Sequence, residues 1–97
     1  MTKCETAICQ LAVNVYGKTS QCTVCMEEMA ELTKELSKNL RGQDNVAHIA
    51  EEIADVEIML EQLKLMFSIR DEVTQQRTVK LQRLDNRISQ SLIHPKP

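Results

Sequence analysis

Aromatic residues are almost absent from this 97-residue chain, which contains one Tyr, one Phe and no Trp. Proteins that bind single-stranded nucleic acid stack the bases on aromatic side chains, so the composition argues against that kind of binding. The chain also lacks a block of basic residues, and its net charge of −2 does not suit a footprint on a phosphate backbone. We therefore expect no nucleic-acid polymer among its partners.

Glycine and proline are equally scarce. There are two of each, and both prolines lie in the C-terminal tail, at Pro95 and Pro97. Only Gly17 and Gly42 interrupt the rest of the chain. Such sparse turn signals favour long helices over a sheet with many turns, so the sequence predicts an all-α fold.

Two kinds of apolar segment are also missing. The first residues form no apolar core of the kind found in a signal peptide, and no apolar run is long enough to span a bilayer. We therefore expect a cytoplasmic protein without a membrane partner. The length suits one small domain over residues 1–97, with residues 1–3 and 93–97 as loose tails.

Four cysteines are present, and they all lie in the first quarter of the chain: Cys4, Cys9, Cys22 and Cys25. In a reducing compartment they remain thiols. The Cys22-x-x-Cys25 spacing is compatible with a zinc site, but both residues lie in a helical pattern and not in a tight knuckle. The interpretation that we favour is buried or half-buried thiols.

Apolar residues recur at helical spacing in four segments, which cover residues 5–16, 21–40, 46–67 and 68–90. In the third segment they form one continuous stripe, expected to be its packed face: Val46, Ile49, Ile53, Val56, Leu60, Leu63 and Phe67. The expected N-terminal caps are Thr19 or Ser20 for the second helix, Asp44 or Asn45 for the third, and Ser68 for the fourth.

Two acidic pairs with helical spacing stand out against this background. The first pair is Glu28 and Glu31 in the second segment, and the other is Glu52 and Asp55 in the third. Side chains three residues apart share a helix face, so two antiparallel helices would bring four carboxylates together. Clustered carboxylates repel one another unless a cation neutralises them, and oxygen ligands select Mg²⁺ or Mn²⁺. The sequence therefore predicts a helical Mg²⁺ site, with Mn²⁺ as a possible substitute.

The residues around these pairs resemble a known family. The sequences Glu27-Glu28-Met29-Ala30-Glu31-Leu32 and Glu51-Glu52-Ile53-Ala54-Asp55-Val56 match the E-x-x-E and E-x-x-D pattern of the MazG-like nucleoside triphosphate pyrophosphohydrolases. The segment that follows, residues 57–63, and the later Lys80-Leu81-x-Arg83-Leu84 are similar to the small phage and prophage-type members. The resemblance covers residues 16–88 and implies an oligomeric fold of the four-helix-bundle type, with dimers that pair into tetramers.

The resemblance also implies a reaction and roles for individual residues. The reaction is hydrolysis of a (deoxy)nucleoside triphosphate to the monophosphate and pyrophosphate. Glu28, Glu31, Glu52 and Asp55 correspond to the metal ligands, and Glu27 and Glu51 are candidates for orienting or deprotonating the water. From their charge and position, Lys80 and Arg83 are candidates for binding phosphate, with Arg87 behind them, and Gln21 for a base or sugar contact. A solvated helix face is the alternative for the basic residues.

Two other classes of protein also use helical carboxylates or present them to solvent. A ferritin-like di-iron bundle requires Glu-x-x-His on two helices, and neither His48 nor His94 has a Glu three residues earlier. The non-enzymatic alternative is a helical oligomerisation or adaptor module whose acidic groups are solvated. The sequence does not specify the preferred base or sugar, the cellular role, the general base, or the choice between dimer and tetramer.

Overall fold

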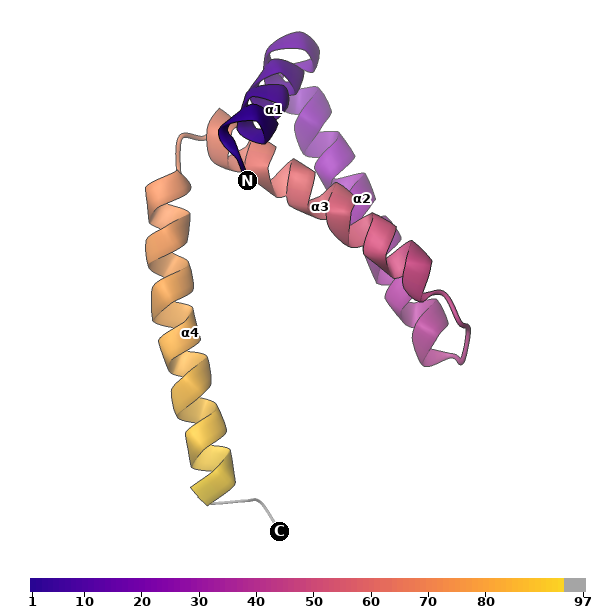
Figure 1. Ribbon diagram of the computed structural model, residues 1–97, viewed down its shortest axis with the longest axis vertical. Helices are drawn as coiled ribbons and strands as arrows, with labels where there is room; N and C mark the ends of the chain where they lie inside the picture. The colour runs from indigo at the N-terminus through magenta and orange to yellow at the C-terminus, as the bar shows by residue number, and fades with distance from the viewer. Residues whose placement is uncertain (94–97) are drawn as a thin grey trace.

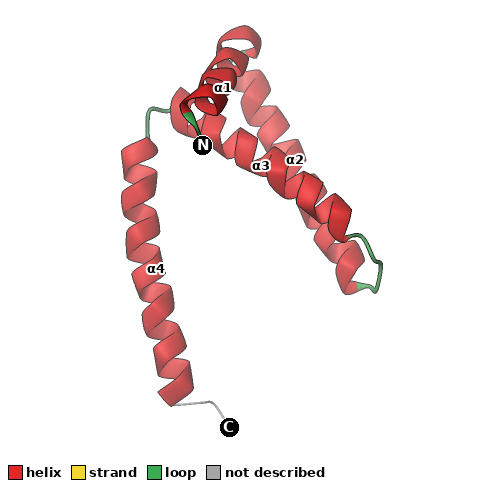
Figure 2. Cartoon of the chain, in the orientation of Figure 1, coloured by secondary structure: helices red, strands yellow, loops and turns green. Residues whose placement is uncertain are grey.

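A computed structural model of the chain describes residues 1–93 and shows an all-helical protein (Figure 2). Within these residues there are four helices and no strand: α1 (Lys3–Tyr16), α2 (Lys18–Leu40), α3 (Val46–Met66) and α4 (Arg70–Ile93). The all-α part of the predicted fold class is therefore confirmed. No helix in residues 1–93 combines the length and the apolar character needed to cross a membrane.

The N-terminus of α1 is held by a capping box and is not loose. The Glu5 amide donates to Thr2 Oγ1 at 3.1 Å, and the Thr2 amide donates to Glu5 Oε1 at 2.8 Å. Lys3 already belongs to the helix, so the expected loose segment 1–3 is wrong for Thr2 and Lys3. At the other end of the chain, Ile93 closes α4, and the remainder of the expected tail, residues 94–97, lies outside the described residues.

A single residue, Gly17, separates α1 from α2. Its φ of +88° lies in a region that side chains strongly disfavour, which explains why glycine stands there. Because α2 begins immediately at Lys18, Thr19 and Ser20 lie within the helix and do not cap it, contrary to the expectation from sequence. The connection is therefore tight and turns the chain sharply.

Hydrogen bonds from a buried asparagine side chain stabilise the turn between α2 and α3. Gly42 takes φ +97°, as a glycine after a helix commonly does. Asn45 precedes α3 as expected, but its side chain does not cap that helix. Its amide instead donates to the backbone oxygen of Glu35 at 2.9 Å and to Glu35 Oε2 at 2.7 Å. The side chain thus anchors the start of α3 to the last turns of α2.

The junction between α3 and α4 also differs from the expectation. Ser68 adopts a positive φ of 54° and α4 begins at Arg70, so Ser68 does not directly precede the helix that it was expected to cap. Arg70 Nη2 donates to Glu61 Oε2 of α3 at 2.7 Å, and Thr6 Oγ1 of α1 donates to the same oxygen at 2.7 Å. This three-residue network fixes the direction in which α4 leaves the hairpin.

The first three helices pack together, whereas α4 stands apart from them. In Figure 1 the α2–α3 hairpin and α4 form the two arms of an inverted V, and α1 lies against the hairpin near the apex. The radius of gyration is 17.1 Å, against about 12.5 Å for a compact domain of this length. Within one chain, α4 contacts only α3 among the other helices, near the start of α4 (Figure 1).

The packed face of the hairpin coincides only in part with the predicted apolar stripe. On α3, Met59 and Gln62 are buried and Glu52 and Met66 are half-buried, whereas Ile53 and Leu60 of the stripe are 42% and 41% exposed. The stripe residues on the side nearer to Met59 are half-buried: Ile49, Val56 and Leu63. The inter-helix contact is therefore centred one residue away from the predicted stripe. Among the described residues, only Cys9, Cys25 and Met59 are fully buried hydrophobic residues. Four of the seven stripe residues therefore remain exposed at the surface of the chain: Val46, Ile53, Leu60 and Phe67.

Candidate metal centre

Three carboxylates from two helices meet across the hairpin. Glu28 projects from α2, and Glu52 and Asp55 project from α3; one oxygen of each lies within 4.8 Å of the others. Glu52 and Asp55 share a face of α3 because they are three residues apart. The antiparallel packing of the hairpin then brings Glu28 opposite them. Three of the four carboxylates of the predicted site thus form a spatial cluster, called here the acidic cluster.

The acidic cluster carries uncompensated negative charge. Burial raises the pKa of Glu28, and the neighbouring charges of Asp55 and Glu52 raise it further. Glu52 Oε2 is buried and has no hydrogen-bond partner. Within residues 1–93, the ion pairs of the chain involve other carboxylates, those of Glu35, Glu51 and Glu61. A buried oxygen without a partner, beside two further carboxylates, is an arrangement that a bound cation would stabilise.

The geometry suits a small, hard cation. Mg²⁺ binds oxygen at 2.0–2.1 Å in an octahedron, so oxygens around one ion lie about 3–4 Å apart. Oxygens within 4.8 Å of one another reach that spacing by small side-chain rotations. The cluster contains neither cysteine nor histidine, which favours Mg²⁺ or Mn²⁺ over zinc.

The other predicted acidic residues lie outside the cluster. Glu31 is exposed on α2, one turn beyond Glu28, and the structure does not bring it into the three-carboxylate group. Glu27 and Glu51 are also exposed, and Glu51 Oε2 lies 3.7 Å from His48 Nδ1. The roles of these three residues as ligand or base remain predictions.

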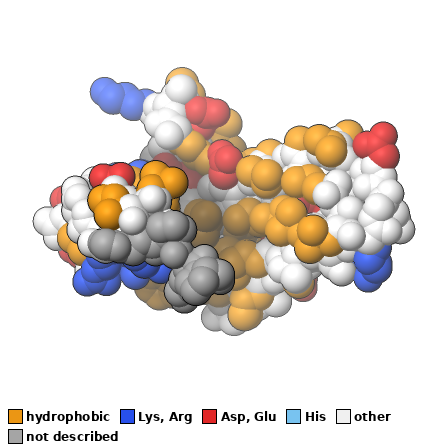
Figure 3. All heavy atoms as spheres, turned by 90° about the horizontal axis from the view of Figure 1, so that it is seen from below, with side chains coloured by type: hydrophobic (Ala, Val, Ile, Leu, Met, Phe, Trp, Pro, Cys, Tyr) orange, Lys and Arg blue, Asp and Glu red, His pale blue; other side chains and the backbone are white. Residues whose placement is uncertain are grey.

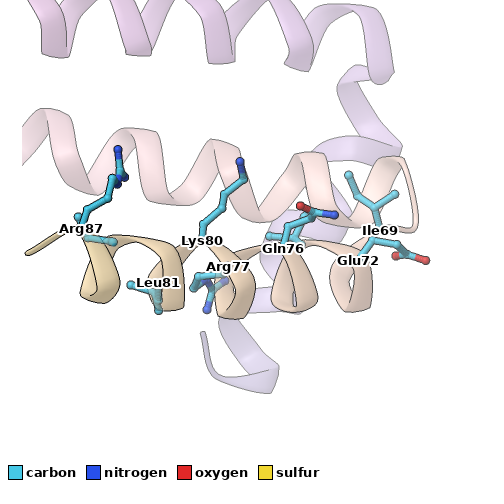
Figure 4. A pocket seen from close by; sticks show the side chains of 9 residues that line it. Ile69, Glu72, Gln76, Arg77, Lys80, Leu81 and Arg87 are labelled. Atoms are coloured by element: carbon cyan, nitrogen blue, oxygen red, sulfur yellow. The ribbon is translucent and has the colours of Figure 1, made fainter. Parts of the chain in front are cut away.

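The predicted nucleotide contacts are dispersed. Gln21 is buried, and its Nε2 donates to Gln62 Oε1 at 2.6 Å, so its amide already serves to hold α2 against α3. Lys80 and Arg83 lie on α4, which makes no contact with α2. In Figure 4, Lys80 and Arg87 extend from the same side of α4, along an open groove of about 640 Å³. Within one chain, the basic residues and the acidic cluster therefore lie on different arms.

Two buried polar networks were not predicted from the sequence. One joins Glu35 to Asn45 and Lys38, and the other joins Glu61 to Arg70 and Thr6. Glu35 and Glu61 have no distinctive neighbours in the sequence, because glutamate is common on helix surfaces.

The cysteines form no metal site in the described residues. All four are free; Cys9 and Cys25 are buried, Cys22 is half-buried and Cys4 is exposed. Cys22 contacts Met66 Sδ at 3.6 Å, and Cys9 contacts the backbone oxygen of Ile58 at 3.8 Å. Burial raises the pKa of the Cys9 and Cys25 thiols, which favours the protonated form that binds zinc poorly. Cys9, Cys22 and Cys25 are thus buried or half-buried, as the favoured interpretation expected, whereas the exposed Cys4 is not.

Comparison of the chain with protein-family models, curated proteins and solved structures finds no match. The acidic cluster and the motif that produces it are therefore the features on which a functional proposal depends.

Proposed function

We propose that this protein is an Mg²⁺-dependent nucleoside triphosphate pyrophosphohydrolase of the MazG-like kind. The observation that carries the proposal is the convergence of Glu28, Glu52 and Asp55, with one buried oxygen of Glu52 lacking any partner. These three residues occupy three of the four ligand positions of the E-x-x-E and E-x-x-D motif. A solvated acidic surface would not explain a half-buried Glu28 facing two carboxylates across a helix interface.

The proposed reaction is attack of water on a (deoxy)nucleoside triphosphate. The bond between the α-phosphorus and the bridging oxygen breaks, giving a monophosphate and pyrophosphate. A bound Mg²⁺ would neutralise phosphate oxygens and acidify a water molecule. Glu28, Glu52 and Asp55 would hold the ion, and Glu31 would complete the set by turning its exposed side chain toward it. Glu27 or Glu51 would accept the proton from the water.

The proposal includes self-association and a cytoplasmic setting. The thin core and the exposed apolar stripe of a single chain fit a homodimer or homotetramer better than a monomer. Four free thiols are compatible with a reducing compartment.

The direct test is release of pyrophosphate from a panel of nucleoside triphosphates with Mg²⁺, with Mn²⁺ and with a chelator. Metal-dependent release is expected, and Glu52→Gln should remove most of it. The matched control is Glu57→Gln, which changes an exposed glutamate on the same helix outside the cluster. Equal rates for Glu52→Gln and the parent would contradict the proposal.

Glu31→Gln decides whether the motif or the three-carboxylate geometry describes the working site. As a fourth ligand, Glu31 should be nearly as sensitive as Glu52. If Glu31→Gln retains the parental rate, the ligand set is the three residues that already converge.

The second candidate is a helical oligomerisation or adaptor module without catalytic activity. The observation that favours it is the large exposed apolar surface, in which Leu40 is 88% and Val46 is 63% exposed. This candidate predicts assembly without metal-dependent release of pyrophosphate, so the same assay separates the two.

A further inference from the structure

A thiol and a thioether from different helices are in contact at one end of the α2–α3 hairpin. Cys22 Sγ of α2 lies 3.6 Å from Met66 Sδ of α3. The contact lies near the start of α2 and the end of α3, close to the apex of the V (Figure 1). Both side chains are half-buried. The hairpin therefore holds two soft sulfur atoms side by side, at a place that the proposed magnesium chemistry does not use.

The separation of these two sulfurs is that of two ligands on one metal ion. A first-row metal ion binds sulfur at about 2.3 Å, so two sulfurs at the tetrahedral angle are about 3.8 Å apart. At the observed 3.6 Å, the angle between two such bonds is about 103°. An ion therefore fits between Cys22 and Met66 by small side-chain rotations, without movement of either helix.

Cys25 supplies a third sulfur on the same face of α2. It lies three residues after Cys22, and side chains at that spacing are neighbours on a helix. Burial raises the pKa of the Cys25 thiol, and the nearby Cys22 raises it further, so the two thiols interact. Together with Met66 they form a set of three sulfurs from two helices, called here the sulfur cluster.

A buried hydrogen bond holds the two helices together beside the sulfur cluster. Gln21 directly precedes Cys22, and Gln62 lies one turn before Met66. Gln21 Nε2 donates to Gln62 Oε1 at 2.6 Å, and both side chains are buried. A bond between α2 and α3 next to the sulfurs fixes the spacing of the sulfurs before an ion arrives. The cluster is thus preorganised by its neighbours in the sequence.

Further sulfur atoms lead from the surface of the hairpin to the cluster. Met26 and Met29 follow Cys22 on the same side of α2, and they are 59% and 41% exposed. Methionines at helical spacing usually fill a core, but these two fill none within the chain. Seen from below, hydrophobic side chains, among which cysteine and methionine are coloured, gather on the open surface of the hairpin (Figure 3). A soft ion therefore has an accessible, sulfur-lined approach to Cys22.

The composition of the sulfur cluster selects a soft ion. A structural zinc site takes four ligands, mostly from Cys and His. Among the described residues, the one group of three or more Cys, His, Asp or Glu side chains close enough to share an ion is the acidic cluster. Two thiols with a thioether suit Cu(I) instead. Mg²⁺ prefers oxygen, so the two ions do not compete for the same ligands.

We propose that Cys22, Cys25 and Met66 bind one Cu(I) ion, which links α2 to α3. Each thiol that binds the ion releases its proton to the solvent, and no electron is transferred. The ion joins two helices that the unfolded chain does not hold together, so binding stabilises the fold. The Cu(I) site uses none of the residues of the acidic cluster and does not depend on the proposed hydrolase activity.

The first experiment is an anaerobic titration of the fully reduced protein with Cu(I), in competition with a chromogenic Cu(I) chelator. One bound ion per chain is expected. Cys22→Ser, Cys25→Ser and Met66→Leu should each weaken binding by about tenfold or more. Met66→Leu is the sharpest of the three, because it keeps an apolar side chain of similar size and removes only the thioether.

The matched control is Cys9→Ser. Cys9 is also buried, and its thiol lies 3.9 Å from the thioether of Met1, but no second cysteine lies three or four residues away. Cys9→Ser should therefore keep the parental affinity. Absence of Cu(I) binding by the parent would overturn the proposal. Loss of binding in Cys9→Ser, with binding retained in Met66→Leu, would also overturn it and assign the ion to the Met1–Cys9 pair.

Thermal melts separate a lost ligand from lost packing. The helical circular-dichroism signal and the metal-free Tm of each variant show that it folds. Cu(I) should then raise the Tm of the parent and of Cys9→Ser, but not that of Met66→Leu or Cys22→Ser. An equal rise in the parent and in both cluster variants would contradict the proposal. A parent that binds Cu(I) and releases no pyrophosphate would keep the Cu(I) site and refute the proposed function.

Discussion

Replacing Glu52 by Gln should stabilise the metal-free protein and abolish its stabilisation by Mg²⁺. This combination is unusual, because most substitutions of partly buried residues lower stability. It follows from the arrangement of the acidic cluster, in which Glu52 faces Glu28 and Asp55 and one of its oxygens has no partner. The glutamine amide has nearly the same shape as the carboxylate, and it can donate a hydrogen bond to a neighbouring carboxylate.

The size of the effect follows from the distances in the acidic cluster. Two unit charges 4.8 Å apart repel by about 3.5 kcal/mol at an effective dielectric constant near 20, and by about 0.9 kcal/mol in water. Because Glu28 and Glu52 are half-buried and Asp55 is exposed, the gain should lie toward the lower end, at about 1–2 kcal/mol. A domain of this size gains about 4–8 °C in Tm for each kcal/mol.

Magnesium should act on the parent in the same direction. A ligand present at ten times its Kd stabilises the folded state by about 1.4 kcal/mol. Thermal melts of the parent and of Glu52→Gln, each with and without Mg²⁺, should show a metal-dependent rise for the parent only. Glu57→Gln serves as the control, because it removes one charge from the same helix without touching the cluster. It should keep the parental Mg²⁺ response.

The prediction would be refuted by a Glu52→Gln variant that melts below the parent without metal and still shows the full Mg²⁺ shift. That outcome would mean that the Glu52 carboxylate is stabilised by its surroundings and does not bind the ion. If Glu52→Gln raises the stability of the metal-free protein but keeps the Mg²⁺ shift, the three carboxylates do repel one another, but Glu52 is not a ligand of the ion.

Three further predictions concern the scaffold. The Arg70 guanidinium and the Thr6 hydroxyl lower the pKa of Glu61, so this group stabilises the fold above its ordinary pKa. That contribution should be lost as the pH falls below about 5, and Glu61→Gln should flatten the acidic limb of a stability–pH curve measured by urea unfolding. Asn45→Ala removes the partner of a buried Glu35 carboxylate oxygen and should lower the free energy of unfolding by about 1–3 kcal/mol, measured in the same way. Gly17→Ala forces a side chain into φ +88° with no new contact to compensate, and should cost about 1–3 kcal/mol, seen as a lower Tm.

The sequence alone determined the local features of this protein. Helical periodicity and the scarcity of glycine and proline predicted four helices, and the end of α2 at Leu40 and the start of α3 at Val46 agree with the structure. The pairing of Glu52 with Asp55 on one face also follows from the sequence, because residues three apart in a helix are always neighbours. Such features depend on interactions within a few residues, which a single segment contains.

Only the tertiary structure decided which faces meet. The rotation of α2 against α3 put Met59, Gln62 and Glu52 into the contact. It left Ile53 and Leu60 outside, although these two belong to the predicted apolar stripe. Consecutive residues of a helix are about 100° apart, and rotating the helix about its axis by that angle leaves the period of its apolar pattern unchanged. The sequence pattern therefore does not show which neighbouring face packs. That rotation brought Glu28, but not Glu31, to the carboxylates of α3, because the convergence of side chains from two helices depends on packing between segments far apart in sequence.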